Sequence, residues 1–186
     1  MEIIKVKGIG LIAFRNYIQT TYKNRYQEWL SKLPGESKKI YTDEITATNW
    51  YSVEDGLVKP MEVSAKLFHN GNVEKSAVAA GLFGGEYTLK GVYKAFLMIA
   101  TPKALIGASK LILGRFYTVA QIKIDDSTKT SLTSSITKIN KRTEYVDYYI
   151  IGWTVRALEL ANCKNVKYKI LKPRYSDKYT TIYSWD

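Results

Sequence analysis

The chain has 186 residues, of which 46% are hydrophobic and 13% aromatic, a composition typical of a packed globular protein and unlike that of a disordered one. Lys and Arg number 28 against 17 Asp and Glu, and the net charge of +11 is compatible with binding to nucleic acid, with an anionic membrane surface or with solubility alone. The single cysteine, Cys163, excludes an internal disulfide framework.

Neither a targeting segment nor a membrane span is expected. The first seven residues read as a short strand, not as the charged start and apolar stretch of a signal peptide. The longest apolar run, residues 95–100, is far shorter than the roughly 20 residues that a membrane helix needs. Together with the lone cysteine, these features favour a cytoplasmic protein.

The first third of the chain has helical periodicity after a short apolar strand at residues 3–6. From residue 11 onward apolar side chains recur three or four positions apart, and this stripe continues until Pro34 and Gly35 stop it (Leu11, Phe14, Ile18, Tyr22, Tyr26, Trp29, Leu30, Leu33). Ser52 then has the properties of an N-cap, with Glu54 and Asp55 in the first turn after it. That helix is expected to end at the turn formed by Asn70 and Gly71.

Residues 72–116 form the helical middle of the chain. An apolar face precedes Gly84 and Gly85, and another covers residues 89–99. Thr101 followed by Pro102 is the expected start of a further helix, because Thr caps helix N-termini and Pro is favoured at the first helical position.

From residue 116 onward the period changes to two, which predicts strands. We expect a strand over residues 116–124, a turn at residues 125–127, a second strand over 132–139, a helix over 145–161, and two more strands with the alternating residues Val166, Tyr168, Ile170 and Thr180, Ile182, Ser184. The chain is therefore predicted to be a single α+β domain, residues 1–186. Its mainly helical part (1–115) is followed by a β-β-α-β-β antiparallel four-stranded sheet (116–186).

Scattered aromatic, glycine and proline positions carry a resemblance to a known family. They are Leu33-Pro34 with Glu36, Trp50-Tyr51 with Pro60, Ile151-Gly152-Trp153, Ala157-Leu158-Glu159, and Cys163-Lys164-Asn165-Val166. Over almost the whole chain these positions resemble a family of uncharacterised bacterial proteins expanded in myxobacteria. That family is similar to the haem–nitric-oxide-binding and 4-vinyl-reductase domains. The resemblance implies a small-molecule sensor fold, and fold alone does not determine chemistry.

The residues that such a family would need for haem or metal are missing. The haem-binding branch uses a histidine near the position of Ala104, and no histidine occurs after His69. It also uses a Tyr-x-Ser-x-Arg motif, whereas residues 145–149 read Tyr-Val-Asp-Tyr-Tyr. Vinyl-reductase-like domains carry clustered cysteines, and this chain has one. We therefore expect no haem, no metal and no other cofactor.

No catalytic group stands out either. His69 lacks a recognisable partner and is expected to be a structural residue at a helix end, and Cys163 a buried, inert thiol. The glycines at 81, 84 and 85 lack the Gly-Lys-Ser/Thr ending of a phosphate loop, so they are expected to form turns or close helix contacts. We therefore expect the protein not to be an enzyme.

Aromatic residues suggest where a ligand would bind. Seven residues fall on segments that should converge between the helical part and the sheet, and they form the candidate ligand pocket: Trp50, Tyr93, Phe96, Leu97, Phe116, Tyr149 and Trp153. A solid core is the alternative interpretation. The leading hypothesis is a non-catalytic binding, sensing or docking domain for an apolar small molecule or a protein partner, and a homodimer stays open.

The second functional hypothesis comes from the basic end of the chain. Lys167, Lys169, Lys172 and Arg174 would form a basic surface, with Tyr168, Tyr175, Tyr179 and Tyr183 as platforms for stacking nucleic-acid bases. No helix-turn-helix or ribonucleoprotein motif supports this hypothesis. A solvated basic face explains the same pattern.

Overall fold

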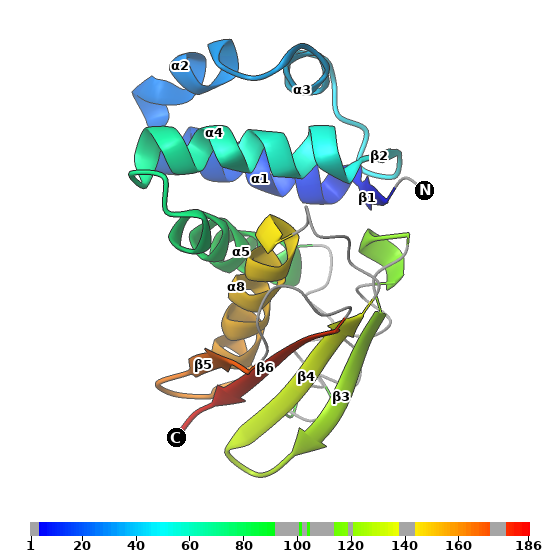
Figure 1. Cartoon of the computed structure of the whole chain (residues 1–186), viewed down its shortest axis with the longest axis vertical. Coiled ribbons are helices and arrows are strands. Elements are labelled where there is room, and N and C mark those ends of the chain that lie inside the picture. Colours follow the sequence, from blue (N-terminus) through cyan, green and yellow to red (C-terminus); the bar gives the residue numbers. More distant parts are fainter. Residues whose placement is uncertain are drawn as a thin grey trace.

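The computed structural model describes residues 4–91, 101, 104, 114–118, 121–137, 144–171 and 178–186. Its elements in chain order are β1 (Lys5–Lys7), α1 (Gly8–Thr21), η1 (Lys23–Arg25), α2 (Tyr26–Ser31), α3 (Gly35–Thr42), β2 (Trp50–Ser52), η2 (Glu54–Val58), α4 (Lys59–Phe68), α5 (Val73–Lys90), β3 (Gln121–Ser127), β4 (Ser131–Thr137), α8 (Glu144–Leu160), β5 (Lys167–Ile170) and β6 (Lys178–Ser184). Helices α1 to α4 lie at one end of the molecule and β3 to β6 at the other, with α5 and α8 between them (Figure 1). The predicted α+β class is confirmed.

The N-terminal helices form around a dense aromatic cluster. Phe14 of α1 contacts the rings of Tyr17, Trp29 and Tyr41, with centroid separations of 6.0–6.3 Å. The Trp29 indole N–H donates a 3.1 Å hydrogen bond to the Pro60 carbonyl, so its one polar group is satisfied although the side chain is fully buried. This cluster fixes α2 and α3 against α1 and α4.

The single long helix expected between residues 11 and 33 is broken in the structure. Helix α1 ends at Thr21, and a 3₁₀ turn begins at Lys23, whose φ of 22° is not helical. The Tyr22 ring stacks on Phe68 at a centroid separation of 3.8 Å, and its hydroxyl lies 2.8 Å from His69 Nε2. These contacts with the end of α4 hold the break in place. Helix α3, which follows Pro34, was not predicted.

Two predicted cap residues form the expected hydrogen bond, although the helix predicted to follow Thr101 lies mostly outside the described residues. Ser52 Oγ accepts a hydrogen bond from the Asp55 N–H at 3.3 Å, and Thr101 Oγ1 accepts one from the Ala104 N–H at 3.2 Å. The predicted turn at Asn70 and Gly71 is also confirmed, since both residues have positive φ (52° and 78°). At these positions local side-chain chemistry indicated the ends of helices correctly.

The larger sheet has the strand order β3-β4-β6-β5, with all neighbours antiparallel. Side chains on one face, among them Leu132 and Tyr183, pack with Ile151 and Leu158 of α8 in a second apolar core. A smaller antiparallel pair joins β1 to β2, with Lys7 opposite Trp50. Among the described helices, none has the length and hydrophobicity needed to cross a membrane.

Two expectations about the strands were wrong. Residues 125–127, predicted as a turn, belong to β3, and the hairpin turns instead at residues 128–130. Phe116, predicted to begin a strand, lies in a short helical segment. In β6 the residues that face α8 are Thr181 and Tyr183, so the predicted alternation at Thr180, Ile182 and Ser184 follows the opposite face.

Candidate functional site

Glycines bring α5 and α8 into direct backbone contact. A Cβ built on Gly81 of α5 would overlap the Tyr149 carbonyl oxygen, and one on Gly152 of α8 would overlap the Val78 carbonyl oxygen. A Cβ on Gly84 would overlap the Tyr149 hydroxyl. The predicted close helix contacts are thus confirmed, and they set the positions of the Tyr149 and Trp153 side chains on α8.

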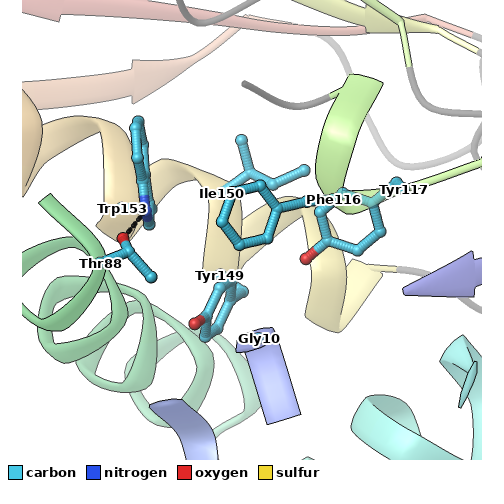
Figure 2. A pocket seen from close by; sticks show the side chains of 7 residues that line it. All are labelled: Gly10, Thr88, Phe116, Tyr117, Tyr149, Ile150 and Trp153. Atoms are coloured by element: carbon cyan, nitrogen blue, oxygen red, sulfur yellow. Dashed lines mark hydrogen bonds between the residues drawn. The ribbon is translucent and has the colours of Figure 1, made fainter. Parts of the chain in front are cut away.

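The inner pocket lies where α1, α5, α8 and residues 114–118 meet, as Figure 2 shows. It is lined by Gly10, Thr88, Phe116, Tyr117, Tyr149, Ile150 and Trp153. The side chains enclose about 20 Å³, which is room for roughly one water molecule. A site for a drug-sized ligand typically measures roughly 300–1,000 Å³. The inner pocket in this conformation therefore admits a molecule of very few heavy atoms.

The indole N–H of Trp153, at one end of the inner pocket, already has a hydrogen-bond partner within the protein. The Trp153 indole N–H donates a 2.9 Å hydrogen bond to Thr88 Oγ1, drawn as a dashed line in Figure 2. The Thr88 hydroxyl donates in turn to the Gly84 carbonyl at 2.7 Å. Burial raises the pKa of Tyr149 and of Tyr117 well above the ordinary value for tyrosine, so both hydroxyls are neutral at physiological pH.

Three of the predicted pocket residues meet in the inner pocket, namely Phe116, Tyr149 and Trp153. Trp50 does not join them: it lies in a separate surface hollow, with 39% of its area exposed. Tyr93, Phe96 and Leu97 lie outside the described residues. The sequence reasoning missed four lining residues, namely Gly10, Thr88, Tyr117 and Ile150. Only the small size of Gly10, next to an apolar stripe, could have indicated a close approach.

The only histidine of the sequence lies beside Tyr22, and the only cysteine lies in the second apolar core. The His69 Nε2 atom lies 2.8 Å from the Tyr22 hydroxyl, beyond the end of α4, and partial burial lowers the histidine pKa. Cys163 is buried in the second core, where desolvation raises the pKa of its thiol. Within the described ranges, no three His, Cys, Asp or Glu side chains come together in a way that could hold a metal ion.

The structure supports one part of the predicted nucleic-acid surface, the exposed lysines, but not the tyrosine platforms that it describes. Lys167 and Lys169 are exposed on β5, as predicted. Tyr183 is buried and cannot serve as a stacking platform, and the Tyr168 hydroxyl donates a 2.8 Å hydrogen bond to Glu74 of α5. The tyrosine face of this sheet therefore turns toward the helices and not toward a nucleic acid. Lys172, Arg174 and Tyr175 lie outside the described residues.

A buried carboxyl group lies on the side of α8 near the sheet. Asp147 is 8% exposed, and its Oδ1 atom has no hydrogen-bond partner in the part of the chain that the structure describes. Desolvation raises its pKa to about 7. The groups that it affects electrostatically are the hydroxyls of Tyr117, Tyr148, Tyr179 and Tyr183, which are themselves neutral at that pH.

Comparison with solved structures gives the clearest relationship. An H-NOX protein from S. oneidensis in the Fe(II)NO ligation state superposes with a TM-score of 0.75 and 12% sequence identity, covering 97% of this chain and 99% of that one. The Fe(II) unliganded H-NOX protein from K. algicida gives a TM-score of 0.72 and 11% identity, covering 97% and 96%. The chain has the H-NOX fold. No protein-family model matches the sequence, and no curated protein matches it significantly.

The resemblance to haem–nitric-oxide-binding domains is thus confirmed at the level of the fold, and the haem itself can be tested against the residues present. The described part of the inner pocket encloses about 20 Å³, far less than a porphyrin requires. Ala104 is exposed, and His69 is bonded to Tyr22 beyond the end of α4. The residues that the structure describes do not fit a haem.

Proposed function

We propose that the chain is a sensing or docking domain on the H-NOX fold that binds a small apolar molecule without haem and without turnover. The inner pocket carries this proposal, because aromatic and aliphatic side chains from separate segments converge there around a polar pair that needs no further partner. Its small volume restricts the ligand to a few heavy atoms unless the wall formed by residues 114–118 moves.

Hydrogen bonds join that wall to β1, and Phe116 and Tyr117 pack in the main apolar core. Tyr117 forms an isolated antiparallel bridge with Val6, and the Thr118 N–H donates to the Lys5 carbonyl at 3.1 Å. The Lys5 N–H donates to Thr118 Oγ1 at 3.0 Å. Opening the pocket would require these hydrogen bonds and the packing of Phe116 and Tyr117 to break, whereas the glycine-mediated contact of α5 with α8 would stay intact.

The proposal is tested on the purified protein by absorbance and by native mass spectrometry. We expect no Soret band before or after addition of haem, because no histidine is available near Ala104. Native mass spectrometry is expected to show either the bare chain or a retained ligand much smaller than a porphyrin. A stoichiometric haem complex with sharp ferrous bands would contradict the haem-free half of the proposal.

A further inference from the structure

A second and much larger concavity lies on the surface beside the N-terminus of α1, and we call it the outer hollow. It measures about 440 Å³ and is lined by Lys7, Ile9, Ala47, Thr48, Trp50, Gly114 and Arg115. Two of these residues are cationic and none is acidic. The remaining lining is mainly apolar, so a ligand would meet hydrophobic contact and positive charge together.

The Trp50 ring is held in place by its neighbour across the β1–β2 pair. Lys7 Nζ lies 4.2 Å from the centroid of the Trp50 ring, within the range of a cation–π interaction. The same ammonium group donates a 2.7 Å hydrogen bond to the Thr48 carbonyl. The Lys7 ammonium group therefore already interacts with the protein itself. It orients the Trp50 ring and the loop that precedes β2.

Arg115 is the free cation of the outer hollow. Its residue is exposed, and no hydrogen bond or ion pair within the described ranges involves its guanidinium group. By contrast Arg25 and Arg156, elsewhere on the surface, both pair with glutamates. A guanidinium presents planar paired donors that match a carboxylate through two parallel hydrogen bonds.

We propose that the outer hollow binds a small organic carboxylate, whose acid group pairs with Arg115 and whose apolar body lies against Trp50 and Ile9. A single free guanidinium in a mainly apolar concavity suits a monoanion with a hydrophobic body. This site does not depend on the proposed role of the inner pocket.

The outer hollow and the inner pocket are separated by the same two segments of chain. Ile9 and Arg115 line the outer hollow, whereas the residues that follow them, Gly10 and Phe116, line the inner pocket. Their ligands therefore contact different side chains. A variant in the outer hollow can fail to bind its probe while the inner pocket is unaffected, so the two proposals fail separately.

The test uses benzoate as the carboxylate and benzamide as its neutral counterpart. Of the four tryptophans only Trp50 is exposed, since Trp29, Trp153 and Trp185 are each at most 9% exposed. Saturable protection of tryptophan fluorescence from acrylamide therefore reports occupancy of the outer hollow. We expect benzoate to protect and benzamide to bind at least about tenfold more weakly, since the neutral amide cannot form charge-assisted hydrogen bonds with the guanidinium.

Matched variants locate the binding. Arg115→Gln is expected to weaken benzoate binding about tenfold by calorimetry, whereas Lys38→Gln, which removes an exposed charge on α3, is expected to leave it unchanged. The protection signal should disappear in Trp50→Phe. The proposal is overturned if benzoate does not saturate, if benzamide binds equally well, if Arg115→Gln has the affinity of Lys38→Gln, or if the signal persists in Trp50→Phe.

Discussion

At the scale of single residues, the least expected group is the carboxyl of Asp147. A carboxylate transferred out of water without a partner is destabilising, so the folded protein favours the protonated form. The tyrosine hydroxyls around it are neutral and offer no compensating charge. Asp147 therefore links the stability of the fold to pH.

The direction of this linkage follows from the raised pKa. In the folded protein Asp147 keeps its proton up to about pH 7, whereas its ordinary pKa is 3.8. The unfolded chain binds fewer protons between these values, so stability should fall as pH rises from 4 to 7 and stay lower above that. At about 1.36 kcal/mol per pKa unit, the loss is up to about 4 kcal/mol.

Urea unfolding of Asp147→Asn between pH 5 and pH 9 measures this contribution. We expect the variant to lose the fall in stability between pH 5 and pH 7 and to exceed the wild type at pH 8 by on the order of 2 kcal/mol. Asp43→Asn, at an exposed aspartate, is the control and should retain the wild-type profile. Parallel profiles for wild type and Asp147→Asn would contradict the prediction.

Two buried phenylalanines distinguish a ligand pocket from a solid core. Phe14 is fully buried among three aromatic rings, whereas Phe116 borders the inner pocket. Phe14→Ala should lower the free energy of unfolding by the roughly 3–5 kcal/mol of a close-packed site. Phe116→Ala should lower it by less and should change the uptake of an apolar dye. Equal losses without dye binding in either variant would mean that the inner pocket is solid core.

The candidate site could be predicted from the sequence only in part. Aromatic type and helical phase were enough to place Phe116, Tyr149 and Trp153 together, because residues 149 and 153 are one helical turn apart. Trp50 was misplaced, because its position depends on how β2 pairs with β1 and on the Lys7 ammonium above its ring. Such non-local pairing leaves no periodic signal in the chain.

At the scale of elements, the close crossing of α5 with α8 depends on glycines, which have no side chain to separate the two backbones. The backbones approach so closely that a methyl group on Gly81 would meet the main chain of α8, which cannot yield as a flexible side chain would. Around the contact, Arg156 of α8 pairs with Glu86 of α5 and, at 2.7 Å, with Glu159. The crossing is therefore a rigid unit.

Gly81→Ala tests that rigidity. Although alanine is the better helix former, we expect the overlap with the Tyr149 carbonyl to lower stability by about 1–3 kcal/mol or more. Gly35→Ala is the matched control, because a Cβ there meets no atom within 4 Å, and it should be neutral or stabilising. Thermal unfolding of both variants provides the measurement. A neutral Gly81→Ala would show that the helices can separate without loss.

The elements themselves were predicted where the signal is local. Caps at Ser52 and Thr101 and the helix that became α8 were recognised from neighbouring residues. The break after α1 and the true turn of the β3–β4 hairpin were missed. The first depends on Tyr22 stacking against Phe68, more than 40 positions away, and the second on a register shift between Ile124 and Asp126.

At the scale of the whole molecule, the charge of +11 is the feature that most favours a nucleic-acid partner. Tyr183 is buried and Tyr168 donates a hydrogen bond to Glu74, so neither of these two tyrosines is available to stack on a base beside the exposed lysines of β5. We interpret the basic residues of this strand as a solvated surface.

Mobility-shift assays at near-physiological salt are therefore expected to show no binding to single- or double-stranded oligonucleotides. If binding did occur through β5, it should weaken steeply with salt and disappear when Lys167 and Lys169 are both changed to Glu. The same change at Lys38 and Lys39 on α3 is the control for net charge. Salt-sensitive binding that only the β5 variant abolishes would revive the nucleic-acid hypothesis.

The crossing of α5 with α8 also has a consequence for the order in which the protein is made. The Thr88–Trp153 hydrogen bond joins residues 65 positions apart, and the contact of Arg156 with Glu86 spans 70. Such distant contacts are slow to form, because the intervening chain must lose entropy before they are made. On the ribosome, the N-terminal helices can associate early, but the glycine face of α5 has no partner until α8 has been synthesised. A nascent chain that stops before residue 144 would expose apolar surface and would be a substrate for chaperones or proteases.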